Sequence, residues 1–434
     1  MKSVAAAFIM LPVLIAGSAC DEVARAGAAA APVVSDSAGI RIITTSRHDT
    51  RTLQLTETLR IPSDSGGEAG PFNNAMVTVG EDGSLYVADQ GGIRVYGADA
   101  HVRRVFSRRG RGPGEFESII DLIPSRPGVA IVDLRLRRIT RFDSAGVVLE
   151  QAGVFNDRRI VLPLSRTDSG WIVRLHERRI SPPGLHRDTT YYRETANIDS
   201  TLRAADWRMP GVESAAVAVP QAWIHYLTQG TYRWGPLWGA SPSLGADARG
   251  HLHVSTGELY DIRTYSASGR LIRIIRRDIP ARVVTDDLVE DYFDRAADAA
   301  AVRAPSLPRE DGAPARGTIA DLERRERPHA ATVPVLGRLI VAADGTIWVE
   351  RLDLVTDPVM LELRGAPART TAWDVIRPDG RIIGTARTPP GFDARCATPN
   401  SLIGVTRDED DVESIVALSL SRDLSSASTP VPAP

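Results

Sequence analysis

The side chains best suited to recognition gather in residues 223–238, WIHYLTQGTYRWGPLW. The aromatic members are Trp223, Tyr226, Tyr232, Trp234 and Trp238, in a chain that is only 6% aromatic. Rigid aromatic faces with polar edges are good anchors for a sugar, a peptide or a partner protein. Hydrogen bonds at such a surface would come from His225, Gln229 and Arg233. The alternative interpretation is that these rings pack an insertion onto the rest of the fold.

Oxygen-bearing side chains near the ends of the predicted strands suggest a second kind of chemistry, calcium binding. The candidates are Asn73, Asp89, Asp121 and Asp133. A hard cation needs several converging oxygens, and no DxDxDG-type loop is present. The alternative is that Asp89 and Asp133 accept hydrogen bonds from the amides of their own turns.

The sequence gives little support for a phosphate-binding loop, a serine hydrolase, a zinc site or nucleic-acid binding. The glycines of GRGPGEF, residues 110–116, lack the following Lys-Ser/Thr of a phosphate loop, so an inter-sheet corner is expected instead. No GxSxG nucleophile elbow occurs. His251 and His253 share one strand face, but a third zinc ligand at a sensible spacing is missing. The net charge of −2 gives no electrostatic footprint for nucleic acid.

The elements that must position these side chains form a repeat. A turn followed by a short apolar strand recurs, with its glycine at Gly83, Gly128, Gly170, Gly250 and Gly345. Glycine supplies the positive φ of a tight reversal, and the first two spacings, 45 and 42 residues, suit one four-stranded antiparallel sheet per repeat. The later spacings, 80 and 95 residues, are about two periods and must hold insertions. We place these at 202–243, which is loop-like, and at 285–329, where Thr285 is a plausible N-cap of a helix.

Counting repeats predicts an all-β, six-bladed β-propeller over residues 39–420, with a short helical insertion. The expected blades lie near 75–112, 116–155, 160–204, 243–280 and 333–388, and a sixth combines 395–420 with a strand from 39–61. Joining both ends of the chain in one blade would close the ring and remove exposed sheet edges. Residues 21–38 are expected to form a flexible linker and residues 421–434 a disordered tail.

These motifs resemble the NHL-repeat type of six-bladed propeller. The resemblance rests on DGSLYVAD at 82–89, IRVY at 93–96 and GRGPGEF at 110–116, with support from DGTIWVE at 344–350 and RDEDDVESIVAL at 407–418. It covers most of residues 39–420; the third blade matches weakly, and the two insertions have no counterpart in the simple repeat. The fold hosts binding modules, scaffolds and several enzyme classes, so the resemblance implies architecture more than function.

The first twenty residues indicate export. Lys2 precedes an apolar stretch, Val4–Ala16, which is too short to span a membrane. Small residues then lead to Cys20, a pattern that resembles a bacterial lipoprotein signal in which this cysteine is acylated and tethers the domain to the bilayer. Gly17 and Ala19 also suit ordinary signal peptidase cleavage. If Cys20 is acylated, Cys396 has no disulfide partner, and we expect it to be a small buried hydrophobe.

The sequence therefore predicts an exported, membrane-anchored propeller of the cell envelope. We expect it to bind a protein, peptide or glycan partner through the two insertions, without a cofactor and without performing chemistry. The alternative is a calcium-dependent lactonase or esterase with its site in the propeller channel, similar to the gluconolactonase-like lactonases that share this architecture.

Overall fold

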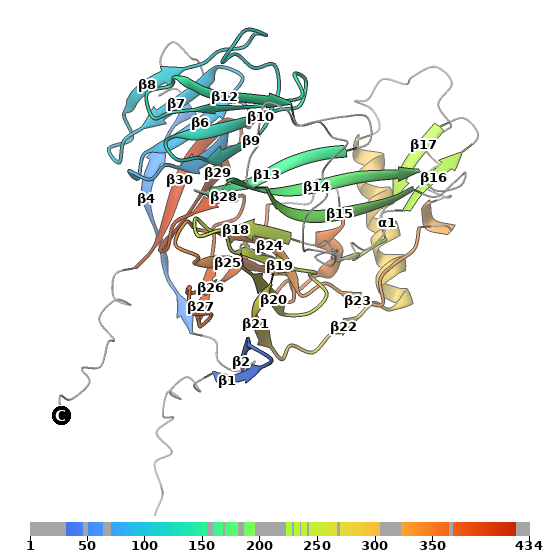
Figure 1. Cartoon of the computed structure of the whole chain (residues 1–434). Helices are drawn as coiled ribbons and strands as arrows, with labels where there is room; N and C mark the ends of the chain where they lie inside the picture. Colours follow the sequence, from blue (N-terminus) through green and yellow to red (C-terminus); the bar gives the residue numbers. More distant parts are fainter. Residues whose placement is uncertain are drawn as a thin grey trace, which may run out of the picture.

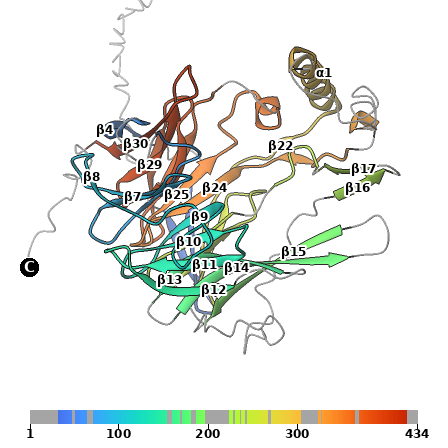
Figure 2. The same cartoon turned by 90° about the horizontal axis from the view of Figure 1, so that it is seen from above.

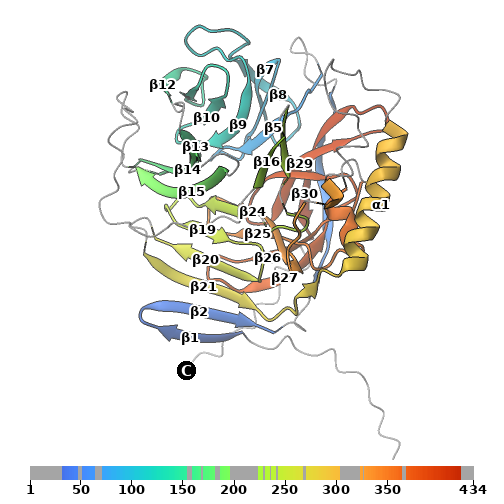
Figure 3. The same cartoon turned by 90° about the vertical axis from the view of Figure 1, so that its right-hand side faces the viewer.

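The computed structural model describes residues 32–46, 51–63, 71–153, 236–240, 243–266, 270–303, 323–325, 327–363 and 368–421, and the backbone alone of the strands in 159–167, 170–180, 186–195, 223–227 and 230–234. Within this part the chain is almost all β, and its sheets are arranged as a β-propeller around a common centre (Figures 1 and 3). The predicted signal segment with Cys20 and the predicted tail from residue 422 onward lie outside the described residues.

Two four-stranded antiparallel meanders come first. The first contains β5 (Met76–Val79), β6 (Leu85–Asp89), β7 (Gly92–Tyr96) and β8 (Val102–Phe106). The second contains β9 (Ile119–Pro124), β10 (Val129–Asp133), β11 (Arg138–Phe142) and β12 (Val148–Gly153). In both sheets the second strand is buried throughout because it packs on both faces, whereas the fourth strand is partly accessible to solvent.

The middle of the chain departs from the regular repeat. A three-stranded sheet contains β13 (Arg159–Thr167), β14 (Gly170–Ile180) and β15 (His186–Thr195). A two-stranded hairpin follows, with β16 (Trp223–Leu227) and β17 (Gly230–Trp234). The insertion predicted as a loop over 202–243 therefore contains a β-hairpin, in which Trp223 pairs with Trp234 and His225 pairs with Tyr232.

Three further sheets complete the arrangement. One has the meander β18 (Ser243–Ala246), β19 (Leu252–Ser255), β20 (Asp261–Tyr265) and β21 (Leu271–Arg277). The next has β24 (Leu336–Val341), β25 (Ile347–Arg351), β26 (Ala372–Ile376) and β27 (Ile382–Arg387). The last has β28 (Asp393–Ala397), β29 (Ser401–Arg407) and β30 (Glu413–Leu420), completed by β4 (Leu55–Ile61).

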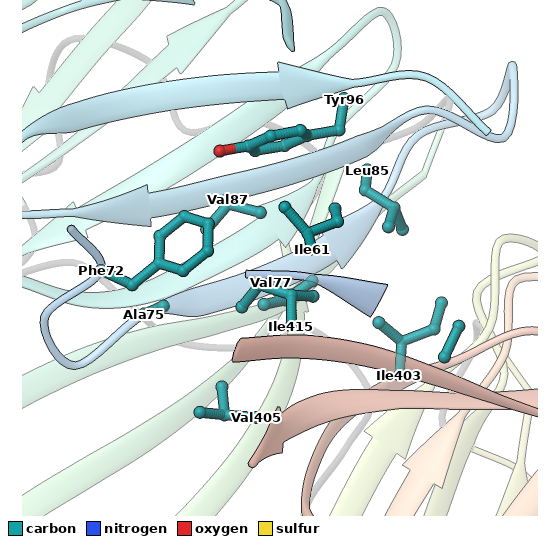
Figure 4. Close-up of a cluster of buried hydrophobic side chains, with 11 residues drawn as sticks. Ile61, Phe72, Ala75, Val77, Leu85, Val87, Tyr96, Ile403, Val405 and Ile415 are labelled. Carbon is teal, nitrogen blue, oxygen red and sulfur yellow. The ribbon is translucent and has the colours of Figure 1, made fainter. Parts of the chain in front are cut away.

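The first strands of six of these sheets touch in a cycle. Strand β5 contacts β9, β9 contacts β13, β13 contacts β18, β18 contacts β24, β24 contacts β28, and β28 returns to β5. The antiparallel pairing of β4 with β30 brings together the two segments from which we predicted the closing sheet. The hydrophobic cluster in Figure 4 fills the space between this closing sheet and the first meander, with Ile61 and Ile415 on one side and Val77 and Tyr96 on the other.

The N-terminal segment crosses the outer edges of three sheets. Strand β2 (Ile40–Thr45) adds in parallel to β21 and is itself covered by β1 (Val33–Ser37). Strand β3 (Thr52–Leu53) adds in parallel to β27, and β4 then completes the closing sheet. The prediction of a flexible linker over residues 21–38 was therefore wrong at its end, because Val33–Ser37 pairs with β2 along all five of its residues.

The helical insertion lies between β21 and β24. The short strands β22 (Arg282–Val283) and β23 (Thr332–Val333) pair with each other and flank helix α1 (Asp286–Arg303). As predicted, α1 begins after Thr285, whose Oγ1 accepts the Leu288 N–H at 3.3 Å. No helix among the described residues is both long and apolar enough to cross a membrane.

Candidate functional site

A cavity of about 790 Å³ lies at the centre of the ring. Its walls are the first strands of five sheets, β5, β9, β18, β24 and β28, together with the turns that follow them. Most lining side chains are small or apolar, including Val79, Leu244 and Val341. The volume lies within the range of small-molecule sites in proteins, so the cavity is the first place to look for a ligand.

Asp121 is the polar group of the cavity with the most unusual environment. Its side chain lies on β9, is exposed to the cavity, and accepts the backbone N–H of Leu122 at 2.9 Å. The protein around the cavity displaces water from this carboxylate, and the desolvation raises the pKa of Asp121 to about 6. Among the described residues no cation forms an ion pair with it.

The other charged groups that line the cavity have partners. Glu81 forms an ion pair with Arg126, and Arg395 forms one with Asp393 at 2.9 Å. Each pair largely neutralises itself, so the net charge that a ligand would meet in the described walls comes from Asp121.

Ser125 and Cys396 are among the lining groups that are polar but neutral. The Ser125 Oγ is buried and has no hydrogen-bond partner in the described part of the chain. Cys396 lines the same cavity, and burial raises the pKa of its thiol to about 12, so it stays protonated. This agrees with its predicted role as a small apolar residue and argues against a reactive thiol.

The four residues proposed to bind calcium do not assemble into one site. Asp89 accepts hydrogen bonds from the backbone N–H groups of Gly91 and Asn73 and pairs with Arg94 at 3.4 Å. Desolvation nevertheless raises the pKa of Asp89, with Arg94 acting in the opposite direction. Asn73 meets this carboxylate only through its backbone, and its exposed side chain is not part of a ligand cluster.

The Asp133 carboxylate, like that of Asp89, is already hydrogen-bonded to backbone amides. It accepts four backbone N–H groups, those of Glu117, Ser118, Arg135 and Leu136. Asp133 therefore holds turn amides, as the alternative to calcium binding predicts for Asp89 and Asp133. Within the described ranges no group of three His, Cys, Asp or Glu side chains comes together at metal-binding spacing.

His251 and His253, in the meander β18–β21, lie close to a carboxylate that sequence reasoning missed. Asp247 is buried; its Oδ2 lies 3.0 Å from His251 Nδ1 and 3.9 Å from His253 Nε2. Although burial opposes ionisation, the hydrogen bonds that Asp247 accepts and the nearby histidines lower its pKa to about 2. Burial lowers the pKa of His253, whose Nδ1 lies 3.1 Å from Thr264 Oγ1. The other carboxylate oxygen of Asp247, Oδ1, accepts the backbone N–H groups of Arg249 and His251. The Asp247 carboxylate therefore holds a turn together.

Trp238 corrects the prediction of an exposed aromatic surface over 223–238. Its side chain is fully buried, packs edge-on against Tyr292 of α1, and donates its Nε1–H to the Pro358 carbonyl at 2.9 Å. Its backbone N–H is donated to Glu362 at 2.8 Å. Trp238 is therefore a core residue, because its ring and both of its donors are used inside the protein.

Trp238 lies at the centre of a satellite core that joins the two predicted insertions. Leu237 exchanges backbone hydrogen bonds with Pro328 and Ala330, from the far end of the helical insertion. The short 3₁₀ helix Pro358–Leu361 closes the cluster from the β25–β26 connection. We call this unit the cap; its buried apolar members are Leu237, Trp238, Val284, Tyr292, Phe293, Val333 and Val359.

The remaining aromatic candidates lie on the hairpin just before the cap. Trp223, His225, Tyr226, Tyr232, Arg233 and Trp234 all fall on β16 or β17, described by their backbone alone. Gln229 lies outside the described residues. Figures 1 and 2 both place β16, β17 and α1 on the same side of the molecule. The hairpin and the helix, one from each predicted insertion, therefore lie on the same side of the molecule.

Solved structures to which this chain is similar resemble it distantly. No family model matches the chain, and no curated protein matches it by sequence. A DUF4221 family member from Bacteroides vulgatus aligns with 85% of this chain and 97% of its own at 12% identity and a TM-score of 0.45. Virginiamycin B lyase from Staphylococcus aureus covers 84% and 99% at 10% identity and a TM-score of 0.37. The calcium-binding protein regucalcin from Agrobacterium tumefaciens covers 85% and 97% at 12% identity and a TM-score of 0.30. Likenesses at this level carry no inference about activity.

Proposed function

We propose that this protein is a six-bladed β-propeller of the NHL-repeat type that binds a protein, peptide or glycan partner in the cell envelope and performs no chemistry. The blade count is supported by the cycle of first-strand contacts from β5 through β28 and back to β5. The NHL type is supported by the left-handed glycines Gly83, Gly128, Gly250 and Gly345, which lie in the repeated turns.

The cap is the structural feature that best supports a binding function. A propeller repeat does not need extra chain between its sheets, yet here two insertions fold against each other around a fully buried tryptophan. Ordering this much chain costs conformational entropy, so we infer that the added surface is used. The sequence of the preceding hairpin contains four aromatic residues, Trp223, Tyr226, Tyr232 and Trp234, and aromatic residues dominate the energetics of binding surfaces.

The proposed location in the cell envelope is supported by the N-terminal sequence. The apolar stretch Val4–Ala16 and the small residues before Cys20 support export. An acyl chain on Cys20 would tether the propeller to a bilayer, with the residues before β1 as the spacer.

The alternative of a calcium-dependent lactonase or esterase has weaker support. Such a site needs several oxygens aimed at one point. The carboxylates of Asp89 and Asp133 are instead committed to amides of their own turns, and Asp121 stands apart from them in the cavity.

The binding proposal is tested by capture experiments with the full chain. The tagged protein would be used to retrieve partners from a solubilised envelope fraction and to probe a glycan array. A double variant, Trp223→Ala with Trp234→Ala, should reduce capture of the specific partner about tenfold or more. Tyr265→Ala, an aromatic deletion on β20, serves as the matched control and should leave capture unchanged.

Two outcomes would contradict the proposal. One is the same partner captured at the same yield by the double variant, and the other is no specific partner in either assay. Calcium-dependent hydrolysis of simple lactones by the purified protein would favour the alternative.

A further inference from the structure

We propose that the central cavity is a binding site for an organic cation, a hydrophobic amine whose ammonium group pairs with Asp121 while its apolar body fills the cavity. This inference is independent of the partner proposed for the cap, because the cavity and the cap are built from different residues. It rests on the size, the lining and the charge of the cavity.

The charge of the described walls selects a cation. Glu81 with Arg126 and Arg395 with Asp393 form ion pairs, which leaves the Asp121 carboxylate without an opposite charge among the described residues. A carboxylate held in a partly dehydrated space gains more from a cationic ligand than the same group on the outer surface would. The upward shift in the pKa of Asp121 reports this desolvation, and an ammonium group beside it would favour the ionised form.

The lining selects an organic ligand over a metal ion. Calcium and similar ions take six or more oxygens, whereas much of the cavity wall is built from aliphatic residues such as Val79, Leu244 and Val341. An alkyl or aryl body would replace water against these side chains, with a gain of roughly 25 cal/mol for each Å² of apolar surface removed from water. A volume of about 790 Å³ holds a ligand of ordinary metabolite size.

Ser125 adds a second, independent indication. Its Oγ lines the cavity, is buried, and forms no hydrogen bond with the described residues. A buried hydroxyl left without a partner costs on the order of 1–3 kcal/mol, and a ligand group in the cavity would satisfy it. Ser125 follows β9 four residues after Asp121, about 13 Å away along an extended chain, so an elongated ligand fits this arrangement better than a compact one.

The test compares three probes of the same shape and different charge, 4-phenylbutylamine, 4-phenylbutanol and 4-phenylbutyrate, by titration calorimetry at about pH 7.5 on the full chain. We expect the amine to bind about tenfold or more tightly than the alcohol, and the carboxylate to give no measurable binding. In Asp121→Asn the amine should bind only as well as the alcohol. Asp410→Asn removes an exposed carboxylate elsewhere and should bind all probes like the parent protein.

A second variant locates the site. Ala246→Phe puts a large side chain into the cavity wall and should abolish binding of both the amine and the alcohol, with folding checked by near-UV circular dichroism. The inference is overturned if the amine has no advantage over the alcohol, if that advantage survives in Asp121→Asn, if Ala246→Phe folds and binds as well as the parent, or if no probe binds. These measurements do not involve the aromatic hairpin. Their outcome is therefore independent of whether the cap binds an envelope partner.

Discussion

Replacing Asp121 by Asn should stabilise the protein, and the gain should grow with pH. The folded-state pKa is about 6, against an ordinary value of 3.8. A carboxyl whose pKa is raised by folding holds its proton more tightly in the folded state. Its contribution is therefore most favourable at low pH and is lost as the pH rises from about 4 to about 6. Above that range the folded protein keeps an ionised, poorly solvated carboxylate that Asn does not have.

The magnitude follows from the same pKa values. A shift of about two units corresponds to about 3 kcal/mol at full strength. Asp121 is open to the water of the cavity, and screening there reduces the expected gain to about 1–1.5 kcal/mol at pH 8. At pH 5, where most folded molecules carry the proton, the gain should be about half as large.

Urea unfolding followed by tryptophan fluorescence, at pH 5 and at pH 8, measures both values. Asp410→Asn is the control for the loss of one surface charge. If Asp121→Asn is no more stable than the parent at pH 8, or if its advantage is equal at the two pH values, the desolvated carboxylate described here is not present.

Four further substitutions test the packing. Trp238→Ala should lower the free energy of unfolding of the cap by about 3–5 kcal/mol, seen as faster hydrogen exchange in α1, because the ring and its hydrogen bond are both buried. Asp374→Asn should destabilise the whole protein by about 3–5 kcal/mol in thermal or urea unfolding, because two buried arginines share this carboxylate at 2.8 and 2.9 Å. Gly83→Ala should cost only about 1 kcal/mol, since its φ is +78° and nothing lies within 4 Å of the new Cβ. Gly128→Ala should cost several times more, because its Cβ would lie 2.4 Å from the carbonyl oxygen of Phe142; equal midpoints for the two glycine variants would contradict this.

The local features of the repeat could be predicted from the sequence because they depend on neighbouring residues. Left-handed turns need glycine, and Gly83, Gly128, Gly250 and Gly345 all have positive φ. The start of α1 depends on a threonine next to an acidic first turn, and it lies where that pattern predicts. Each of these signals comes from a few consecutive residues.

The features that the sequence did not predict depend on contacts between distant segments. Nothing near Trp238 in the chain shows that Tyr292 and Pro358 will surround it, so its aromatic neighbours suggested a surface role. The setting of Asp121 likewise depends on strands from five sheets that line one cavity. Asp247 could have been linked to His251 by its i, i+4 spacing in a turn, but its burial could not.

The pairing of the N-terminal segment could not be predicted from the sequence repeat. A meander leaves the outer edge of its fourth strand unpaired, and such edges favour aggregation. Here β2 and β3 cover the edges of β21 and β27 in parallel, and β4 covers β30. Two of these additions are short or parallel and do not belong to the repeat, so a count of periodic turns cannot find them. Because one continuous stretch binds three consecutive sheets, its pairing links their outer edges as well as closing the ring. Loss of β2 and β3 alone should then expose two sheet edges while leaving the closing pair of β4 and β30 in place.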